Sequence, residues 1–205
     1  MESPRRPAKN ARMTRDQALR ALAFGGAVAA AGAAYGARGE TGTSLAARSA
    51  STDAKILNAF LLLEQIQESF YRAALATKRL SGPLQAFATT LARQEADHVA
   101  FLAEQLGERA RPRPQSDFGA LLESPEAFRD AAIELEEAAI AAYIGQGANL
   151  RRRTVAAVAP LVSVEARQAA WIRDLAGLSP APRAADPARD VDAVVADLRK
   201  QGFVR

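Results

Sequence analysis

Two glutamates of the chain are each followed, at the same interval, by a tyrosine. Glu64 precedes Tyr71 by seven residues, and Glu136 precedes Tyr143 by seven residues. Residues at this spacing lie on one face of an α-helix, about two turns apart. A carboxylate can bind a metal ion and a phenol can donate an electron, so each pair could serve a metal site. The alternative is that both tyrosines are ordinary core aromatics.

A second repeat places a further metal-ligating side chain three residues after a glutamate. Glu95 and His98 form an E-x-x-H, and Glu165 and Gln168 form an E-x-x-Q. Residues three apart share a helix face, so both side chains of a pair can reach the same site. Carboxylate and imidazole ligands together suit iron or manganese. The second pair is the weaker one, because glutamine offers only a neutral oxygen.

All four glutamates fall within apolar helical stripes, where an ionised carboxylate needs a partner. Burying one without a partner costs several kcal/mol. Four carboxylates facing one another would repel, and some would have to take up protons. Bound divalent cations remove this conflict, and helix pairs with inward Glu, Glu and His are typical of a dinuclear metal site in a four-helix bundle. We therefore expect iron or manganese, as one or two ions.

The ligand set predicts two unequal metal positions. The firmly held ion is expected to be bound by Glu64, Glu95 and His98. Glu95 would bridge to a labile ion held by Glu136 and Glu165, with Gln168 as a weak ligand. A single ion or none are the alternatives, since His98 is the only histidine of the chain and could be an ordinary core residue.

The apolar periodicity predicts an all-α protein with four long helices. They are expected over residues 53–78, 84–106, 124–147 and 153–175. The stretch 108–124 has no helical repeat and is long enough to cross a bundle rather than form a tight hairpin. Pro160 is expected to kink the fourth helix or to mark a later start. A short amphipathic helix near 190–200 is expected to dock on the bundle.

Three further acids are expected on outer helix faces, in contact with water. They are Glu68, Glu134 and Glu137. An arginine run at 151–153 is interpreted as a solvated helix start.

Charge is distributed unevenly along the chain. Residues 1–37 contain six of the 27 Lys and Arg and two of the 23 Asp and Glu, so the rest of the chain carries 21 of each. A neutral body argues against a nucleic-acid partner, which requires a basic face. There are no cysteines, which excludes disulfides and thiolate metal sites. Metal ions are the expected partners, and a homo-oligomer is compatible with the sequence.

The N-terminal region has the pattern of an export signal. Arg12, Arg15 and Arg20 precede an uncharged run rich in Ala and Gly, and 31–33 reads Ala-Gly-Ala, a suitable cleavage site. The segment is similar to a twin-arginine signal, except that Asp16 stands where the second arginine is expected. We expect an exported protein of the periplasm, cell envelope or exterior. An uncleaved membrane anchor is the alternative.

These patterns divide the chain into four parts. They are an export signal or anchor (1–37), a flexible linker (38–52), a four-helix bundle (53–178), and a linker with a short C-terminal helix (179–205).

The chain resembles the ferritin-like superfamily, and within it an exported bacterial family related to plant desiccation-related proteins. The segments that carry the resemblance are LNAFLLLEQIQESFYRAAL (57–75), RQEADHVAFL (93–102), DFGALLESPEAF (117–128), LEEAAIAAYIG (135–145), VEARQAAWIRDLAG (164–177) and GFV (202–204). The resemblance implies a four-helix bundle with a long crossover between its second and third helices. The metal ligands that it implies are Glu64, Glu95, His98, Glu136 and Glu165. The family usually has His where this chain has Gln168.

Two functions are expected from these observations. The first is a metal-binding protein that oxidises Fe(II) with O2 or peroxide, with Tyr71 and Tyr143 as electron donors. The second is a non-catalytic, stress- or desiccation-associated structural protein with a relic metal site. Peroxide disproportionation would need two firmly held ions, and Gln168 argues against it.

Overall fold

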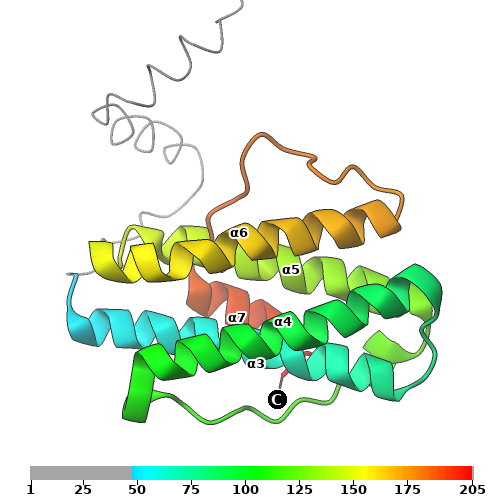
Figure 1. The fold of residues 1–205 in the computed structure, drawn as a ribbon, viewed down its shortest axis with the longest axis horizontal. Helices are drawn as coiled ribbons and strands as arrows, with labels where there is room; N and C mark the ends of the chain where they lie inside the picture. The colour runs from blue at the N-terminus through cyan, green and yellow to red at the C-terminus, as the bar shows by residue number, and fades with distance from the viewer. Residues whose placement is uncertain (1–47, 205) are drawn as a thin grey trace, which may run out of the picture. The chain divides into compact units, whose positions relative to one another are not determined.

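The computed structural model describes residues 48–204, in which every regular element is a helix (Figure 1). The four long helices are α3 (Ala50–Ala76), α4 (Gly82–Leu106), α5 (Pro125–Gly147) and α6 (Arg152–Leu175). A short helix, α7 (Val191–Lys200), follows them. The predicted all-α bundle of four long helices with a short C-terminal helix is therefore confirmed. The predicted export signal, and the part of the predicted linker before residue 48, lie outside the described residues.

The connection between α4 and α5 crosses the length of the bundle. It contains two 3-10 turns, η2 (Gly107–Arg109) and η3 (Gly119–Leu122), and joins helix ends at opposite ends of the bundle (Figure 1). α3 packs along α4, and α5 packs along α6, each pair running in opposite directions (Figure 1). Within the described part of the chain, no helix has the length and apolar character needed to cross a membrane.

Capping residues fix where the helices begin. The Ser49 hydroxyl accepts a hydrogen bond from the Thr52 amide at 3.0 Å, so α3 begins at Ala50, three residues earlier than the sequence predicted. Ser124 caps α5 in the same way, and Pro125 follows it at the first helical position, as predicted.

Pro160 lies inside a continuous helix. α6 begins at Arg152, so a later start marked by Pro160 is wrong. The proline removes a backbone donor that would otherwise bond to the carbonyl of Ala156. Both Ala156 and Pro160 are exposed, so the lost hydrogen bond lies on the solvent-facing side of α6, and the helix continues.

Two apolar clusters fill the bundle, one towards each end. The first is centred on Phe70, Phe87 and Phe128, and includes the buried residues of α7. The second is centred on Phe60 and Leu102. On α3, α4 and α6 the predicted inward glutamate lies where residues of one cluster give way to residues of the other. On α5 the change comes later, at Ala142 and Tyr143, but Glu136 accepts a hydrogen bond from the same Gln67 amide as Glu165. The four glutamates therefore share one polar layer between two apolar ones.

The crossover is fastened to α3 by polar contacts. Glu68, expected on an outer face, is instead only 5% exposed, because Arg113 of the crossover and Arg72 of α3 both pair with it. Asn58 also bonds to the crossover, accepting from the Arg111 amide at 2.8 Å. The prediction for Glu68 was wrong because its burial depends on a partner 45 residues away.

The other two acids agree better with the prediction. Glu134 is exposed, and Glu137 is half-buried beside Arg173, at 2.5 Å.

Candidate metal centre

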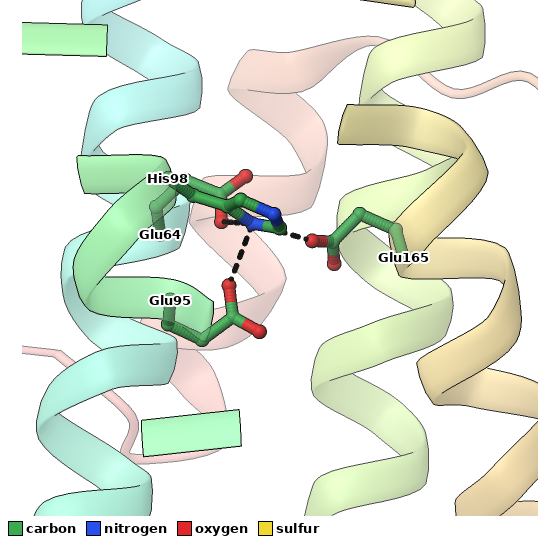
Figure 2. Close-up of side chains that lie close together, drawn as sticks. All are labelled: Glu64, Glu95, His98 and Glu165. Atoms are coloured by element: carbon green, nitrogen blue, oxygen red, sulfur yellow. Dashed lines mark hydrogen bonds and ion pairs between the residues drawn. The ribbon is translucent and has the colours of Figure 1, made fainter. Parts of the chain in front are cut away.

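The imidazole of His98 lies at the centre of the polar layer. Its Nδ1 atom is 3.1 Å from Glu64 Oε2, 3.0 Å from Glu95 Oε2 and 3.0 Å from Glu165 Oε1. These side chains come from three helices: α3 carries Glu64, α4 carries Glu95 and His98, and α6 carries Glu165. Figure 2 shows Glu165 approaching His98 from the side opposite to Glu64 and Glu95. One ring nitrogen thus faces three carboxylate oxygens.

The arrangement has the dimensions of a metal-binding cluster. Each of the four residues offers one ligand atom, and these four atoms all lie within 4.8 Å of one another. The three glutamates are fully buried (0% exposed), and His98 is 8% exposed. Carboxylate oxygens with an imidazole nitrogen form a donor set suited to iron or manganese.

Each of the three carboxylates is held through its other oxygen by a hydrogen-bond donor. The Tyr143 hydroxyl donates to Glu64 Oε1 at 2.5 Å, and the Gln168 amide donates to Glu95 Oε1 at 2.7 Å. The Gln67 amide donates to Glu165 Oε2 at 3.1 Å. Donors to the outer oxygens of ligating carboxylates orient them and are part of a working metal site.

Glu136 lies in the same layer but outside this cluster. Its Oε1 atom accepts from the Tyr71 hydroxyl at 2.5 Å and from the Gln67 amide at 3.1 Å. The structure therefore groups Glu165 with Glu64, Glu95 and His98, whereas the sequence had paired Glu165 with Glu136. Rotation of α6 relative to α4 decides this grouping, and helical periodicity does not specify it.

Gln67 is a residue of this candidate site that the sequence reasoning missed. Its side chain is 1% exposed, and its amide joins Glu136 of α5 to Glu165 of α6. A signal was present, because Glu64 and Gln67 repeat the E-x-x-Q spacing of Glu165 and Gln168.

Gln168 has its amide nitrogen towards the carboxylates. Besides Glu95, the amide also donates to Gln94 Oε1 at 3.2 Å, while Gln168 Oε1 lacks a partner. In this arrangement Gln168 supports Glu95 as a donor, rather than presenting its oxygen at the cluster.

Burial and mutual repulsion govern the protonation of the carboxylates. Burial, then the charge of Glu165, raises the pKa values of Glu95 and Glu136 well above the ordinary value. Burial, then the charge of Glu64, raises the pKa of Glu165 to about 7. In the absence of a cation, protons retained on these carboxyl groups reduce the repulsion between them.

The histidine and the tyrosines respond to the same charges. Burial lowers the pKa of His98, but the neighbouring carboxylates of Glu165, Glu64 and Glu95 outweigh it and raise the pKa above its ordinary value. Burial and the nearby carboxylates raise the pKa values of Tyr71 and Tyr143, so both phenols keep their protons and donate.

Unpartnered buried oxygens provide a test of whether a cation fits. His98 Nδ1 carries one proton at most, so it cannot donate to three carboxylates at once. Glu165 Oε1 lies close to that nitrogen but lacks hydrogen-bond geometry, and Glu136 Oε2 also has no donor. Among the described residues, the buried side-chain atoms of this layer without a partner are all oxygens. The residues present therefore fit a bound cation.

Fold and site together define a class of protein, a helical bundle with a carboxylate- and histidine-lined core. A family profile described as a ferritin-like domain matches residues 52–178, which is more than half of the chain. The chain belongs to the ferritin-like domain family. A search of curated proteins finds no significant match.

Proposed function

We propose that this protein binds iron or manganese in the core of its bundle, with Glu64, Glu95, His98 and Glu165 as the metal ligands. One observation carries the proposal: three buried carboxylates from three helices present an oxygen to the same imidazole nitrogen, at 3.0–3.1 Å. A metal ion in place of the shared proton would satisfy all three oxygens at once.

Bound Fe(II) would supply one-electron oxidation chemistry, with O2 or peroxide as the oxidant. The chain's own residues fix the ligands and exclude bulk water, since the two apolar clusters close the layer on both sides. The Tyr143 hydroxyl donates a hydrogen bond to Glu64, and the Tyr71 hydroxyl donates one to Glu136. These contacts support both phenols as the electron donors of such a reaction, with Tyr143 in contact with a proposed ligand.

The second candidate is a non-catalytic structural protein with a relic site. The specific observation in its favour is that Gln67 and Gln168 already donate to three of the four glutamates. These amide contacts stabilise the layer without any ion.

Export completes the proposal, with the cell envelope, periplasm or exterior as the compartment. It is supported by the arginines at 12, 15 and 20 before an uncharged run. Cell fractionation, followed by N-terminal sequencing of the recovered protein, tests it. A mature chain beginning soon after residue 33 is expected. A full-length chain in the membrane fraction would favour the anchor instead.

Elemental analysis of protein purified without chelators tests the metal site. We expect iron or manganese in the wild type, and loss of that metal in His98→Ala. Glu134→Ala, which removes an exposed acid from α5, is the matched control and should keep its metal. Absence of metal from the wild type, even after aerobic loading with Fe(II), would favour the relic-site function.

A further inference from the structure

We infer that this bundle core is built for a single metal ion, and that the carboxamide of Gln67 occupies the role of the second cation of a dinuclear site. The inference rests on the proposed function, because it assumes that Glu64, Glu95, His98 and Glu165 bind metal.

The first observation is that both carboxylate oxygens of each proposed glutamate ligand already have a neighbour. Glu64, Glu95 and Glu165 each direct one oxygen towards His98 Nδ1. The remaining oxygen of each is occupied by a donor, 2.5–3.1 Å away. A dinuclear site needs carboxylates that bridge, with one oxygen for each ion. Here the second oxygens of these three glutamates accept hydrogen bonds instead, so the carboxylate oxygen of the layer left for a second ion is Glu136 Oε2, which has no donor among the described residues.

The second observation is where the Gln67 nitrogen lies. It is 3.1 Å from Glu136 Oε1 and 3.1 Å from Glu165 Oε2, between the two carboxylates that a second ion would have to join. An amide nitrogen has two protons and can serve both acceptors, which a hydroxyl could not do. The two N–H donors of the neutral Gln67 amide thus take the place of a cation between Glu136 and Glu165.

The orientation of this amide is determined by its surroundings. If the carboxamide were turned over, the two hydrogen bonds from its nitrogen to Glu136 and Glu165 would be lost, and its oxygen, which has no partner in the described part of the chain, would face the two carboxyl groups instead. Gln67 is 1% exposed, so the side chain has no alternative position in solvent. Glu136 is further held by Tyr71, at 2.5 Å. A second ion would have to displace the Gln67 side chain, which is buried and makes two hydrogen bonds.

The inference also explains why the second metal position of a dinuclear site is missing. If only the lack of a second histidine prevented dinuclear binding, restoring it with Gln168→His would be sufficient. If Gln67 prevents it, Gln168→His alone leaves one ion, whereas Gln67→Ala removes the obstruction and frees Glu136 and Glu165. These two substitutions therefore separate the explanations.

The experiment is a Mn(II) titration of the metal-free protein, read by bound-metal analysis after equilibrium dialysis and by electron paramagnetic resonance. The wild type should bind one magnetically isolated ion per chain. Gln67→Ala should bind two ions, with a spectrum showing exchange coupling between them. Gln168→His should still bind one. Gln65→Ala is the matched control on α3, because Gln65 contacts the crossover at Arg111 and not the site.

Three outcomes overturn the inference. The first is a coupled pair of ions in the wild type, a result that needs no variant. The second is a single ion in a folded Gln67→Ala, with folding checked by circular dichroism. The third is a second ion gained by Gln168→His alone. If the wild type binds no Mn(II) or Fe(II) at all, the proposed function fails with it, and this result is distinct from the other three.

Discussion

The amide nitrogen of Gln168 lies 2.7 Å from Glu95 Oε1, so the residue in the expected place of a second histidine donates to a carboxylate of the site. Glu95 Oε2 faces His98 at the same time, at 3.0 Å. Gln168 therefore positions a proposed ligand, and its contribution can be measured through metal affinity.

Gln168→Ala should weaken metal binding without abolishing it. Loss of a donor that orients a ligating group typically lowers metal affinity about 10–100-fold. Isothermal titration with Mn(II) measures the change. Gln94→Ala is the control, because Gln94 accepts a hydrogen bond from Gln168 and, among the described residues, its side chain makes no hydrogen bond with the four glutamates. An unchanged affinity in Gln168→Ala would contradict the positioning role.

The two tyrosines provide a matched pair of substitutions. Tyr143→Phe removes the donor to Glu64, a proposed ligand, and should lower metal affinity. Tyr71→Phe removes the donor to Glu136, outside the cluster, and should leave the affinity for one ion nearly unchanged. Tyr143→Phe should destabilise the metal-free protein by about 1–3 kcal/mol, because Glu64 Oε1 loses its donor. Tyr71→Phe should destabilise it less, because Glu136 Oε1 keeps the hydrogen bond from Gln67.

Chemical denaturation and metal titration of both variants check this prediction. Equal losses of affinity would show that Glu136 shares the ion with Glu64. The account would then be wrong about which acids form the site.

The stability of the metal-free protein should fall as pH rises from about 4.5 to 7. Burial and the charge of Glu64 raise the pKa of Glu165 from 4.5 to about 7, so in this range the folded state retains a proton that the unfolded chain has released. His98 acts in the same direction above its unfolded pKa of 6.5, because its folded pKa is raised.

Thermal unfolding across this pH range, with and without bound metal, measures the effect. Glu165→Gln is the control, since it lacks this titration and should show a weaker fall. Bound metal should increase stability most at the upper end of the range, where the carboxylate is ionised. A wild type that gains stability with pH relative to Glu165→Gln would contradict the prediction.

Gly145 is expected to be required for the C-terminal segment to dock. A Cβ atom added there would lie 1.9 Å from the carbonyl oxygen of Arg189, whose amide donates to Ala141 at 2.9 Å. Gly145→Ala should therefore detach the segment before α7 and lower the melting temperature.

Gly147→Ala is the matched control for this prediction. A Cβ atom at Gly147 meets nothing within 4 Å, and alanine favours helix by up to about 1 kcal/mol. Limited proteolysis between residues 179 and 190 distinguishes the two variants. Equal resistance of Gly145→Ala and the wild type would show that the close approach is not needed.

Helical periodicity was sufficient to predict the bundle and the layer of glutamates. Glu64, Glu95, Glu136 and Glu165 each lie on an apolar stripe, and the structure buries all four completely. A residue on the apolar stripe of a helix is buried because that stripe faces the other helices. A small rotation of the helix about its axis does not change this.

Contacts between distant segments could not be predicted in this way. Whether Glu165 faces His98 or Glu136 depends on how far α6 is rotated, and periodicity does not resolve such a small angle. The burial of Glu68 depends on Arg113, which belongs to a crossover without regular structure. The E-x-x-Q spacing of Glu64 and Gln67 could have placed Gln67 near the site, but not its role, because its amide joins two acids only once three helices are in place.

Anomalous diffraction from crystals loaded with Mn(II) tests the central claim most directly. The account predicts one anomalous peak, bounded by His98 Nδ1, Glu64 Oε2, Glu95 Oε2 and Glu165 Oε1. A loaded crystal with no peak among these atoms, or with its peak between Glu136 and Glu165, would contradict it.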